Sequence, residues 1–142
     1  MRLQCSGLFE VALPASTAID LFTPVGERSW VPGWAPVYPA GAASESAGTV
    51  FTTVVHAVTT IWTIIEIDRT AGAAAYSRVT PGLHAGIVGV WCVDAGLNRC
   101  AVKVAYDMTS LADDPSVLAE YAAPAFDEMM REWSIAVAAS LA

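Results

Sequence analysis

Residues 99–110 read RCAVKVAYDMTS and show a clear alternation of apolar and polar side chains. Five apolar side chains share one parity: Cys100, Val102, Val104, Tyr106 and Met108. Lys103 and Asp107 take the other parity. Successive side chains of a β-strand point to opposite faces, so this pattern predicts a strand with one face on a core and the other toward solvent.

Four similar runs precede this one, rich in Val, Ile, Thr and aromatic residues. They are TVFTTVVHAV (49–58), TTIWTIIEID (59–68), AAAYSRVT (73–80) and HAGIVGVWCV (84–93). The connections between them are short and carry turn residues such as Pro and Gly. Short connections join antiparallel neighbours, so the second half of the chain predicts a meander of five strands.

The flanking segments complete an α+β pattern. Residues 2–12 predict a first strand, and STAIDLF (16–22) a short helix that ends at Pro24. VYPAG (37–41) is compatible with one more short strand, which would bring the sheet to six or seven strands. Asp113 and Asp114 are suited to cap a long final helix that runs to about Leu141, and Pro124 should bend it.

The tryptophan-rich segment 26–34, GERSWVPGW, resembles the GE-x-x-W-x-PGW element of small bacterial members of the START-like (SRPBCC) superfamily, the polyketide cyclase/dehydratase-like helix-grip proteins. GTVFTT, TTIWTIIEID, YSRVTPG and VKVAYDMTSL look like the strand signatures that follow it. The resemblance implies one domain over residues 1–142, with a curved antiparallel sheet around a long C-terminal helix and two short helices after the first strand. It also implies an apolar cavity between sheet and helix.

The amino-acid composition restricts the functions and partners that the protein can have. Hydrophobic residues make up 55% of the chain and charged residues 15%, so apolar side chains either fill a large core or line a cavity. The net charge is −7, and Lys103 is the only lysine, which argues against nucleic acid or an anionic membrane as partner. No apolar run is long enough to span a membrane, and no secretory signal precedes the first strand, so we expect a cytoplasmic protein. The three cysteines form no metal-binding motif, and no nucleotide-binding fingerprint is present, so we expect no metal and no cofactor.

Strand parity predicts which side chains face inward. In the run 84–93 we place His84, Val88 and Cys92 inside and Trp91 outside. If the protein forms a homodimer, we expect Trp91 at the contact, because an outward tryptophan leaves an apolar patch on the sheet. In the run 59–68 the choice between the face of Trp62, with Ile64 and Glu66, and the face of Ile61 stays open.

On that assignment the interior holds a few polar groups: Glu66, Tyr76, Arg78, His84 and Tyr106. Glu66 and Arg78 could form a structural ion pair or a polar anchor inside an apolar pocket. His84 is either exposed at the start of its strand or available for acid–base chemistry. Glu66, Arg78 and His84 are therefore the candidate catalytic residues, with no motif that fixes them.

If the fold encloses such a cavity, we expect ten residues to line it and bind the ligand. They are Trp30, Trp34, Trp62, Tyr76, Arg78, Val88, Val104, Tyr106, Met129 and Trp133. We expect Trp30 and Trp34 near the mouth with hydrated indole N–H groups; alternatively, they plug the end of the core.

Three functions compete. The first is binding of a hydrophobic small molecule, such as a lipid, polyketide or aromatic metabolite. The second is a cyclase or dehydratase acting on a polyketide-like substrate in the same cavity, and the third is a protein–protein interaction module with a collapsed cavity. The residue pattern is compatible both with a binding protein and with an enzyme.

Two cysteines flank the last predicted hairpin. If residues 95–97 form its loop, Cys92 lies directly opposite Cys100 on the inner face. We expect both to be reduced, buried thiols, because opposed residues sit further apart than a disulfide prefers.

Overall fold

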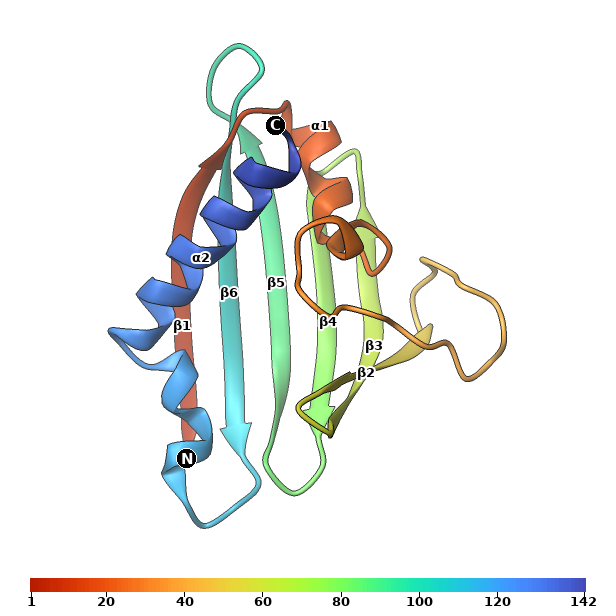
Figure 1. The fold of residues 1–142 in the computed structure, drawn as a ribbon, viewed down its shortest axis with the longest axis vertical. Coiled ribbons are helices and arrows are strands. Elements are labelled where there is room, and N and C mark those ends of the chain that lie inside the picture. Colours follow the sequence, from red (N-terminus) through yellow and green to blue (C-terminus); the bar gives the residue numbers. More distant parts are fainter.

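The computed structural model describes residues 1–142, and Figure 1 shows a single curved sheet with a long helix lying across one face. The first part of the chain comprises β1 (Arg2–Val11), α1 (Ala15–Ala18), η1 (Ile19–Phe22) and η2 (Gly26–Ser29). The meander comprises β2 (Val50–Val55), β3 (Val58–Asp68), β4 (Ala73–Thr80), β5 (His84–Asp94) and β6 (Cys100–Ser110). The chain ends with η3 (Pro115–Tyr121) and α2 (Ala125–Ser140).

The sheet has the strand order β1-β6-β5-β4-β3-β2, and every neighbouring pair is antiparallel. The predicted meander is therefore confirmed, and β1 closes the sheet beside its last strand. The segment VYPAG adds only an isolated bridge between Val37 and Thr52, so the sheet has six strands.

The predicted C-terminal helix is divided into two pieces. Asp114 caps η3 by accepting a hydrogen bond from the amide of Ser116, and η3 ends at Tyr121. Pro124 lacks an amide hydrogen and starts the next helix instead of bending a continuous one. The spacing of Phe126, Met130 and Val137 buries one stripe of α2 against the sheet, as an amphipathic helix requires.

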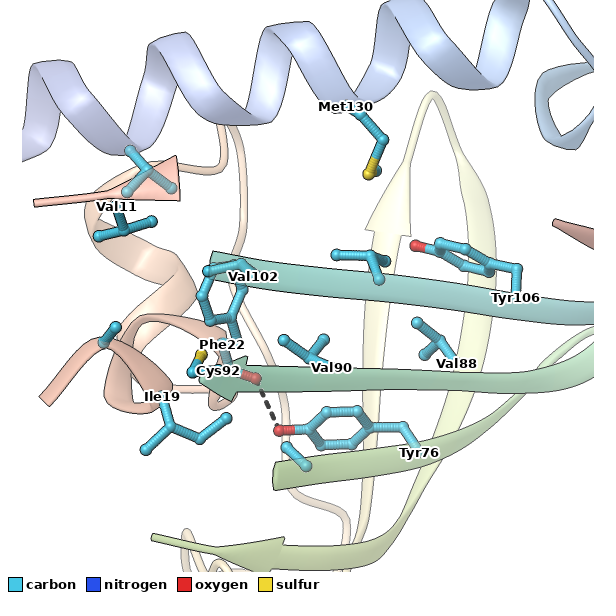
Figure 2. Packing of buried hydrophobic residues seen from close by; sticks show 14 of the residues in the cluster. Val11, Ile19, Phe22, Tyr76, Val88, Val90, Cys92, Val102, Tyr106 and Met130 are labelled. Carbon is cyan, nitrogen blue, oxygen red and sulfur yellow. Dashed lines mark hydrogen bonds between the residues drawn. The ribbon is translucent and has the colours of Figure 1, made fainter. Parts of the chain in front are cut away.

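The parity predicted for β5 and β6 is confirmed. Val88, Val90 and Cys92 are buried on the inner face of β5, and Cys100, Val102, Val104, Tyr106 and Met108 on that of β6. Figure 2 shows several of these side chains between the sheet and Met130 of α2. Trp91 is 41% exposed on the outer face, as predicted. Its role in a subunit contact stays a prediction.

The hairpin between β5 and β6 corrects the predicted register. Asp94 pairs with Cys100, and Cys92 pairs with Val102, so the connection has five residues, Ala95 to Arg99. The prediction assumed a three-residue loop centred on Gly96. Cys92 and Cys100 are thus diagonal neighbours on the inner face and not directly opposed.

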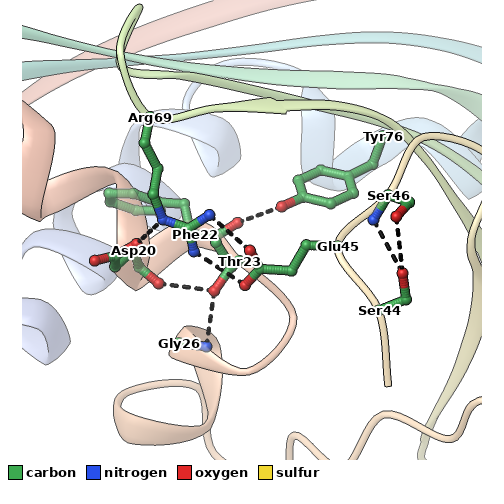
Figure 3. A network of polar contacts seen from close by, with 9 residues as sticks. All are labelled: Asp20, Phe22, Thr23, Gly26, Ser44, Glu45, Ser46, Arg69 and Tyr76. Carbon is green, nitrogen blue, oxygen red and sulfur yellow. Dashed lines mark hydrogen bonds and ion pairs between the residues drawn. The ribbon is translucent and has the colours of Figure 1, made fainter. Parts of the chain in front are cut away.

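Arg69, at the turn between β3 and β4, holds the irregular segments against the sheet. Its guanidinium donates to Asp20 of η1 at 2.6 Å and to Glu45 of the 42–48 loop at 2.6 Å (Figure 3). The hydroxyl of Thr23 bridges the carbonyl of Asp20 and the amide of Gly26 in the same network. These contacts fix the start of the tryptophan-rich segment above the sheet.

No helix of the molecule combines the length and the apolarity that a membrane span requires.

Candidate functional site

A cavity of about 460 Å³ lies on the concave face of the sheet, enclosed by η2 and the segment after it, η3 and α2. Twenty-two residues line it, and 15 of these are hydrophobic. A volume of a few hundred cubic ångströms with a largely apolar lining and a few polar groups is the usual anatomy of a small-molecule site. The interior of the fold is therefore not collapsed.

The opening of the cavity is mostly apolar, although Glu120 is part of it. Several lining residues are also partly exposed, and they mark its rim: Val31, Trp34, Val55, Val58, Leu83, Glu120 and Met129. Val55 and Val58 flank the two-residue turn of His56 and Ala57, whose positive φ angles of 50° and 64° suit a tight hairpin. A ring of exposed apolar side chains around a hollow is typical of a surface that meets an apolar molecule.

Four aromatic rings form one wall of the cavity. Trp62 of β3 stacks on Phe51 of β2 with 5.7 Å between ring centres, and Trp34 packs edge-on against Trp62 at 5.7 Å. Tyr76 of β4 completes the wall at 6.3 Å from Trp62. The Trp62 indole donates to the hydroxyl of Thr53 at 3.0 Å, which fixes its ring plane. The open question about β3 is thereby answered, because the face of Trp62 and Ile64 is the inner one.

The structure separates the two tryptophans of the segment GERSWVPGW. Trp34 lines the cavity, whereas Trp30 packs between Phe22 and Trp133 and is not part of the lining. Each indole donates to a backbone carbonyl at 2.7 Å, Trp30 to Leu21 and Trp34 to Pro24. The expectation of hydrated indoles is wrong for both residues. Trp30 instead matches the alternative of a plug in the core.

Arg78 is the cation inside the cavity. It lies on β4 directly opposite Trp62, and its guanidinium carbon is 4.7 Å from the centre of the Trp62 ring and 6.0 Å from that of Tyr121. Its Nε atom is buried without a hydrogen-bond partner. The aromatic faces stabilise the positive charge but accept no conventional hydrogen bond from it.

Glu66 is not in the interior. A bulge between Ile64 and Glu66 shifts the pairing of β3 with β4, and it turns the carboxylate outward into solvent. The predicted pairing of Glu66 with Arg78 is therefore wrong, because Glu66 faces Ala75 in the register and Arg78 faces Trp62.

Two carboxyl groups do line the cavity, and one of them belongs to Glu27 of η2. Burial raises its pKa well above the ordinary value, and the positive charge of Arg78 opposes this shift. The sequence pattern contained this residue in the GE of GERSW. An irregular segment has no periodicity from which an inward direction could be predicted.

His84 lies inside, at the start of β5, and is 6% exposed. Its Nε2 atom is 3.9 Å from a carboxylate oxygen of Glu120, its Nδ1 atom is buried without a partner, and its ring packs edge-on against Tyr121. Burial, followed by the charge of Arg78, lowers the pKa of His84, while Glu120 opposes the shift. The imidazole is therefore neutral at neutral pH.

Most of the predicted ligand-binding residues line the cavity together. They are Trp34, Trp62, Tyr76, Arg78, Val88, Tyr106, Met129 and Trp133, and His84 joins them. Val104 does not, because it is fully buried in the core beneath α2, where Met130 points toward β6 (Figure 2). The prediction missed Glu27, Glu120, Tyr121 and the inward threonines Thr53, Thr60 and Thr80. The threonines share the parity of Phe51, Trp62 and Tyr76, so strand periodicity could have found them.

Several solved structures of other proteins have the same architecture. Norcoclaurine synthase from Thalictrum flavum superposes with a TM-score of 0.70 at 12% identity, over 99% of this chain and 94% of the other. The fold is the helix-grip fold, a curved antiparallel sheet around a long C-terminal helix. The structure of Ara h 8.0201 gives a TM-score of 0.72 at 12% identity, over 99% of both chains. The di-domain ARO/CYC protein BexL, of the BE-7585A biosynthetic pathway, gives 0.73 at 15% identity over 98% of this chain and 46% of the other.

No protein-family model and no curated protein matches the sequence. At identities of 12% to 15% the likeness is one of fold, and a fold of this kind serves many functions. The chemistry of the cavity in this chain therefore depends on its own side chains.

Proposed function

We propose that this helix-grip protein binds a hydrophobic small molecule in the cavity between its sheet and α2. The observation that carries the proposal is an open cavity of about 460 Å³ with a predominantly apolar lining and an apolar rim. A buried apolar surface of this kind favours a ligand that loses water on entry. The open interior also speaks against an interaction module with a collapsed cavity.

The fold neighbours support a small aromatic or polycyclic ligand in general terms. One structure of the norcoclaurine synthase is a complex with dopamine and hydroxybenzaldehyde, and BexL is named as an ARO/CYC protein. The aromatic wall of Trp34, Phe51 and Trp62 offers edges and faces against which a flat ring can pack.

The test uses N-phenyl-1-naphthylamine, a neutral apolar dye whose fluorescence rises when it leaves water. The wild-type protein should bind it saturably. Val88, which lies between Tyr76 and Tyr106 on the inner face, is replaced by Phe to fill the cavity. Ile87→Phe is the matched control, because it adds the same ring to the outer face of the same strand, where Ile87 is exposed.

We expect Val88→Phe to weaken dye binding about 10-fold or more and Ile87→Phe to leave it unchanged. Equal effects of the two variants, or no saturable binding by the wild type, would refute binding in the cavity. Native mass spectrometry of the purified protein, which detects co-purifying small molecules, identifies the natural ligand directly.

A second function, acid–base catalysis on a polyketide-like substrate in the same cavity, is favoured by the neutral His84 imidazole. It ranks below binding because the 3.9 Å between His84 and Glu120 exceeds hydrogen-bond distance, so no oriented acid–base pair is present. The test is cyclisation of a synthetic β-polyketide thioester, followed by absorbance. Loss of turnover in His84→Gln with unchanged dye binding would support catalysis, and absence of turnover in the wild type would leave binding alone.

A further inference from the structure

The arginines of this protein divide into paired and unpaired groups. Arg2, Arg69, Arg99 and Arg131 each form an ion pair with at least one carboxylate. Arg28 forms none but is exposed to water, which solvates its charge. Arg78 also forms none, yet it lies in the cavity among aromatic rings.

An unpaired guanidinium in such a place is energetically unfavourable by itself. Removing a charge from water is costly unless a counter-charge and hydrogen-bond acceptors replace the lost water. Trp62 and Tyr121 offer their ring faces, and the Nε atom of Arg78 is buried without an acceptor. An acceptor supplied by a ligand would complete this site.

A second unsatisfied atom lies at the same corner of the cavity. Only two buried side-chain atoms of the protein lack a hydrogen-bond partner, Nε of Arg78 and Nδ1 of His84. The pairing of β4 with β5 places Gly86 opposite Arg78 and His84 opposite Thr80, so Arg78 and His84 are diagonal neighbours on the inner face. The polar groups that lack partners are thus concentrated at one place in an otherwise apolar lining.

The carboxyl groups that share the cavity do not neutralise Arg78. Glu27 and Glu120 both line it, but neither forms an ion pair with the guanidinium. Burial of Glu27 favours its protonated form, and Glu120 is exposed at the rim beside His84. With Glu120 as the carboxylate beside it, one guanidinium is suited to a ligand of a single negative charge, because a dianion would meet more repulsion than one guanidinium offsets.

We propose, building on the binding function above, that the ligand is an amphipathic monocarboxylate whose carboxylate binds Arg78 and whose apolar body lies along the aromatic wall. A guanidinium matches a carboxylate in geometry through two parallel N–H···O bonds. The wall of Trp34, Phe51 and Trp62 begins directly beside Arg78, because Trp62 is its cross-strand partner. A carboxylate at Arg78 therefore leaves the apolar body in contact with these rings.

The experiment measures displacement of N-phenyl-1-naphthylamine by compounds that share one chain and differ in the head group. Decanoate and 1-decanol are the main pair, and decyl phosphate tests the alternative of a phosphate head. The wild type should bind decanoate about 10-fold or more tightly than decanol, since a hydrogen bond to a charged group is worth about that factor. It should also bind decanoate more tightly than decyl phosphate.

Three variants locate the effect. Arg78→Met should lose the preference for decanoate over decanol, with both compounds measured against the dye affinity of the variant itself. Arg78→Lys should keep part of the preference, because it retains the charge without the fork of N–H groups. Arg28→Met, at the unpaired arginine on the surface, should behave as the wild type does.

The possible outcomes distinguish the carboxylate site at Arg78 from the binding of a hydrophobic molecule in the cavity. Dye binding without any preference for decanoate overturns the carboxylate site and leaves the proposed binding function intact. An unchanged preference in Arg78→Met, or tighter binding of decyl phosphate, also overturns it. Failure of dye, decanoate and decanol to bind overturns both.

Discussion

The guanidinium carbon of Arg78 lies 4.7 Å from the centre of the Trp62 ring, and the two residues are directly opposed on β4 and β3. This contact joins the two parts of the cavity, because Trp62 belongs to the aromatic wall and Arg78 to the polar corner. Arg78 is only partly buried, so the cation–π contact stabilises it by about 0.5–2 kcal/mol, whereas its buried Nε atom, which lacks an acceptor, costs about 1–3 kcal/mol. Arg78 is therefore held at an energetic cost to the empty protein.

The first prediction is that replacing Arg78 by Met stabilises the empty protein. Methionine keeps much of the apolar length of the side chain and removes the unpaired charge. Exchange of buried charges for apolar groups is often neutral or stabilising, and we expect a gain of about 1 kcal/mol in the free energy of unfolding. Chemical denaturation in the absence of ligand measures it.

The control for this prediction is Arg99→Met, which removes an exposed partner of Glu10 and should change stability by less than about 0.5 kcal/mol. A loss of about 1 kcal/mol or more in Arg78→Met would mean that the empty protein already satisfies the guanidinium. Such a loss would contradict the prediction.

The second prediction concerns the hydroxyl of Tyr76, which donates to the backbone carbonyl of Phe22 at 2.7 Å (Figure 2). This bond joins β4 to the end of η1. Tyr76→Phe leaves a buried carbonyl without its donor, and we expect it to lower the free energy of unfolding by about 1–2 kcal/mol. Tyr38→Phe is the comparison, since its ring also packs on Phe51 and no hydrogen bond holds its hydroxyl. Equal stability of the two variants would argue against a structural role for the bond.

The burial of β5 and β6 could be predicted from the sequence because a regular strand has a strict period of two. In β6 that period continues without interruption from Cys100 to Met108, and every predicted inward residue is buried. The same rule fails in β3 at the bulge after Ile64, since one extra residue reverses the direction of all that follow. The prediction of an inward Glu66 was wrong for this reason.

The polar corner was harder to predict for a different reason. Arg78 and His84 lie on regular strands, and parity placed both inside. Glu27 lies on η2, where the chain direction depends on tertiary contacts such as the bond from Trp30 to the carbonyl of Leu21. Those contacts join residues whose spacing in the sequence has no regular period. The inward direction of Glu27 could therefore be seen only in the structure.

The third prediction is that His84 and Glu27 make the stability of the protein depend on pH in opposite directions. The folded protein lowers the pKa of His84, so between that value and 6.5 the unfolded chain holds a proton that the folded protein lacks. Stability due to His84 therefore falls as the pH is lowered through this window. The folded protein raises the pKa of Glu27, so between 4.5 and the raised value the folded protein holds the extra proton. Stability due to Glu27 therefore falls as the pH rises.

Urea unfolding between pH 4.5 and pH 7 separates the two effects. Relative to the wild type, Glu27→Gln should gain stability toward pH 7, because it removes a carboxyl group whose ionisation the folded protein disfavours. His84→Gln should gain stability toward the acidic end. The pKa of Asp107, lowered to about 2 mainly by its hydrogen bond with Arg2, affects stability only below this range. Parallel pH profiles for the wild type and both variants would refute the assignment.

The last prediction concerns the thiols of Cys92 and Cys100. Both side chains are buried, and burial raises the pKa of both, to about 12 for Cys92. Thiols react as thiolates, so these two should not react with a disulfide reagent at pH 8 while the protein is folded. As diagonal neighbours across β5 and β6 they also lie further apart than the directly opposed pair that the sequence suggested, and a disulfide prefers a Cβ separation of about 3.8 Å.

We therefore expect three free thiols in denaturant without added reductant, and no reaction of Cys92 or Cys100 in the native protein. Cys5→Ser isolates the pair, because Cys5 is only half-buried on β1. This variant should show no reactive thiol when folded and two when unfolded. Fewer than two free thiols in the unfolded variant would mean that Cys92 and Cys100 are oxidised, and rapid native labelling would mean that the inner face of β5 opens to solvent.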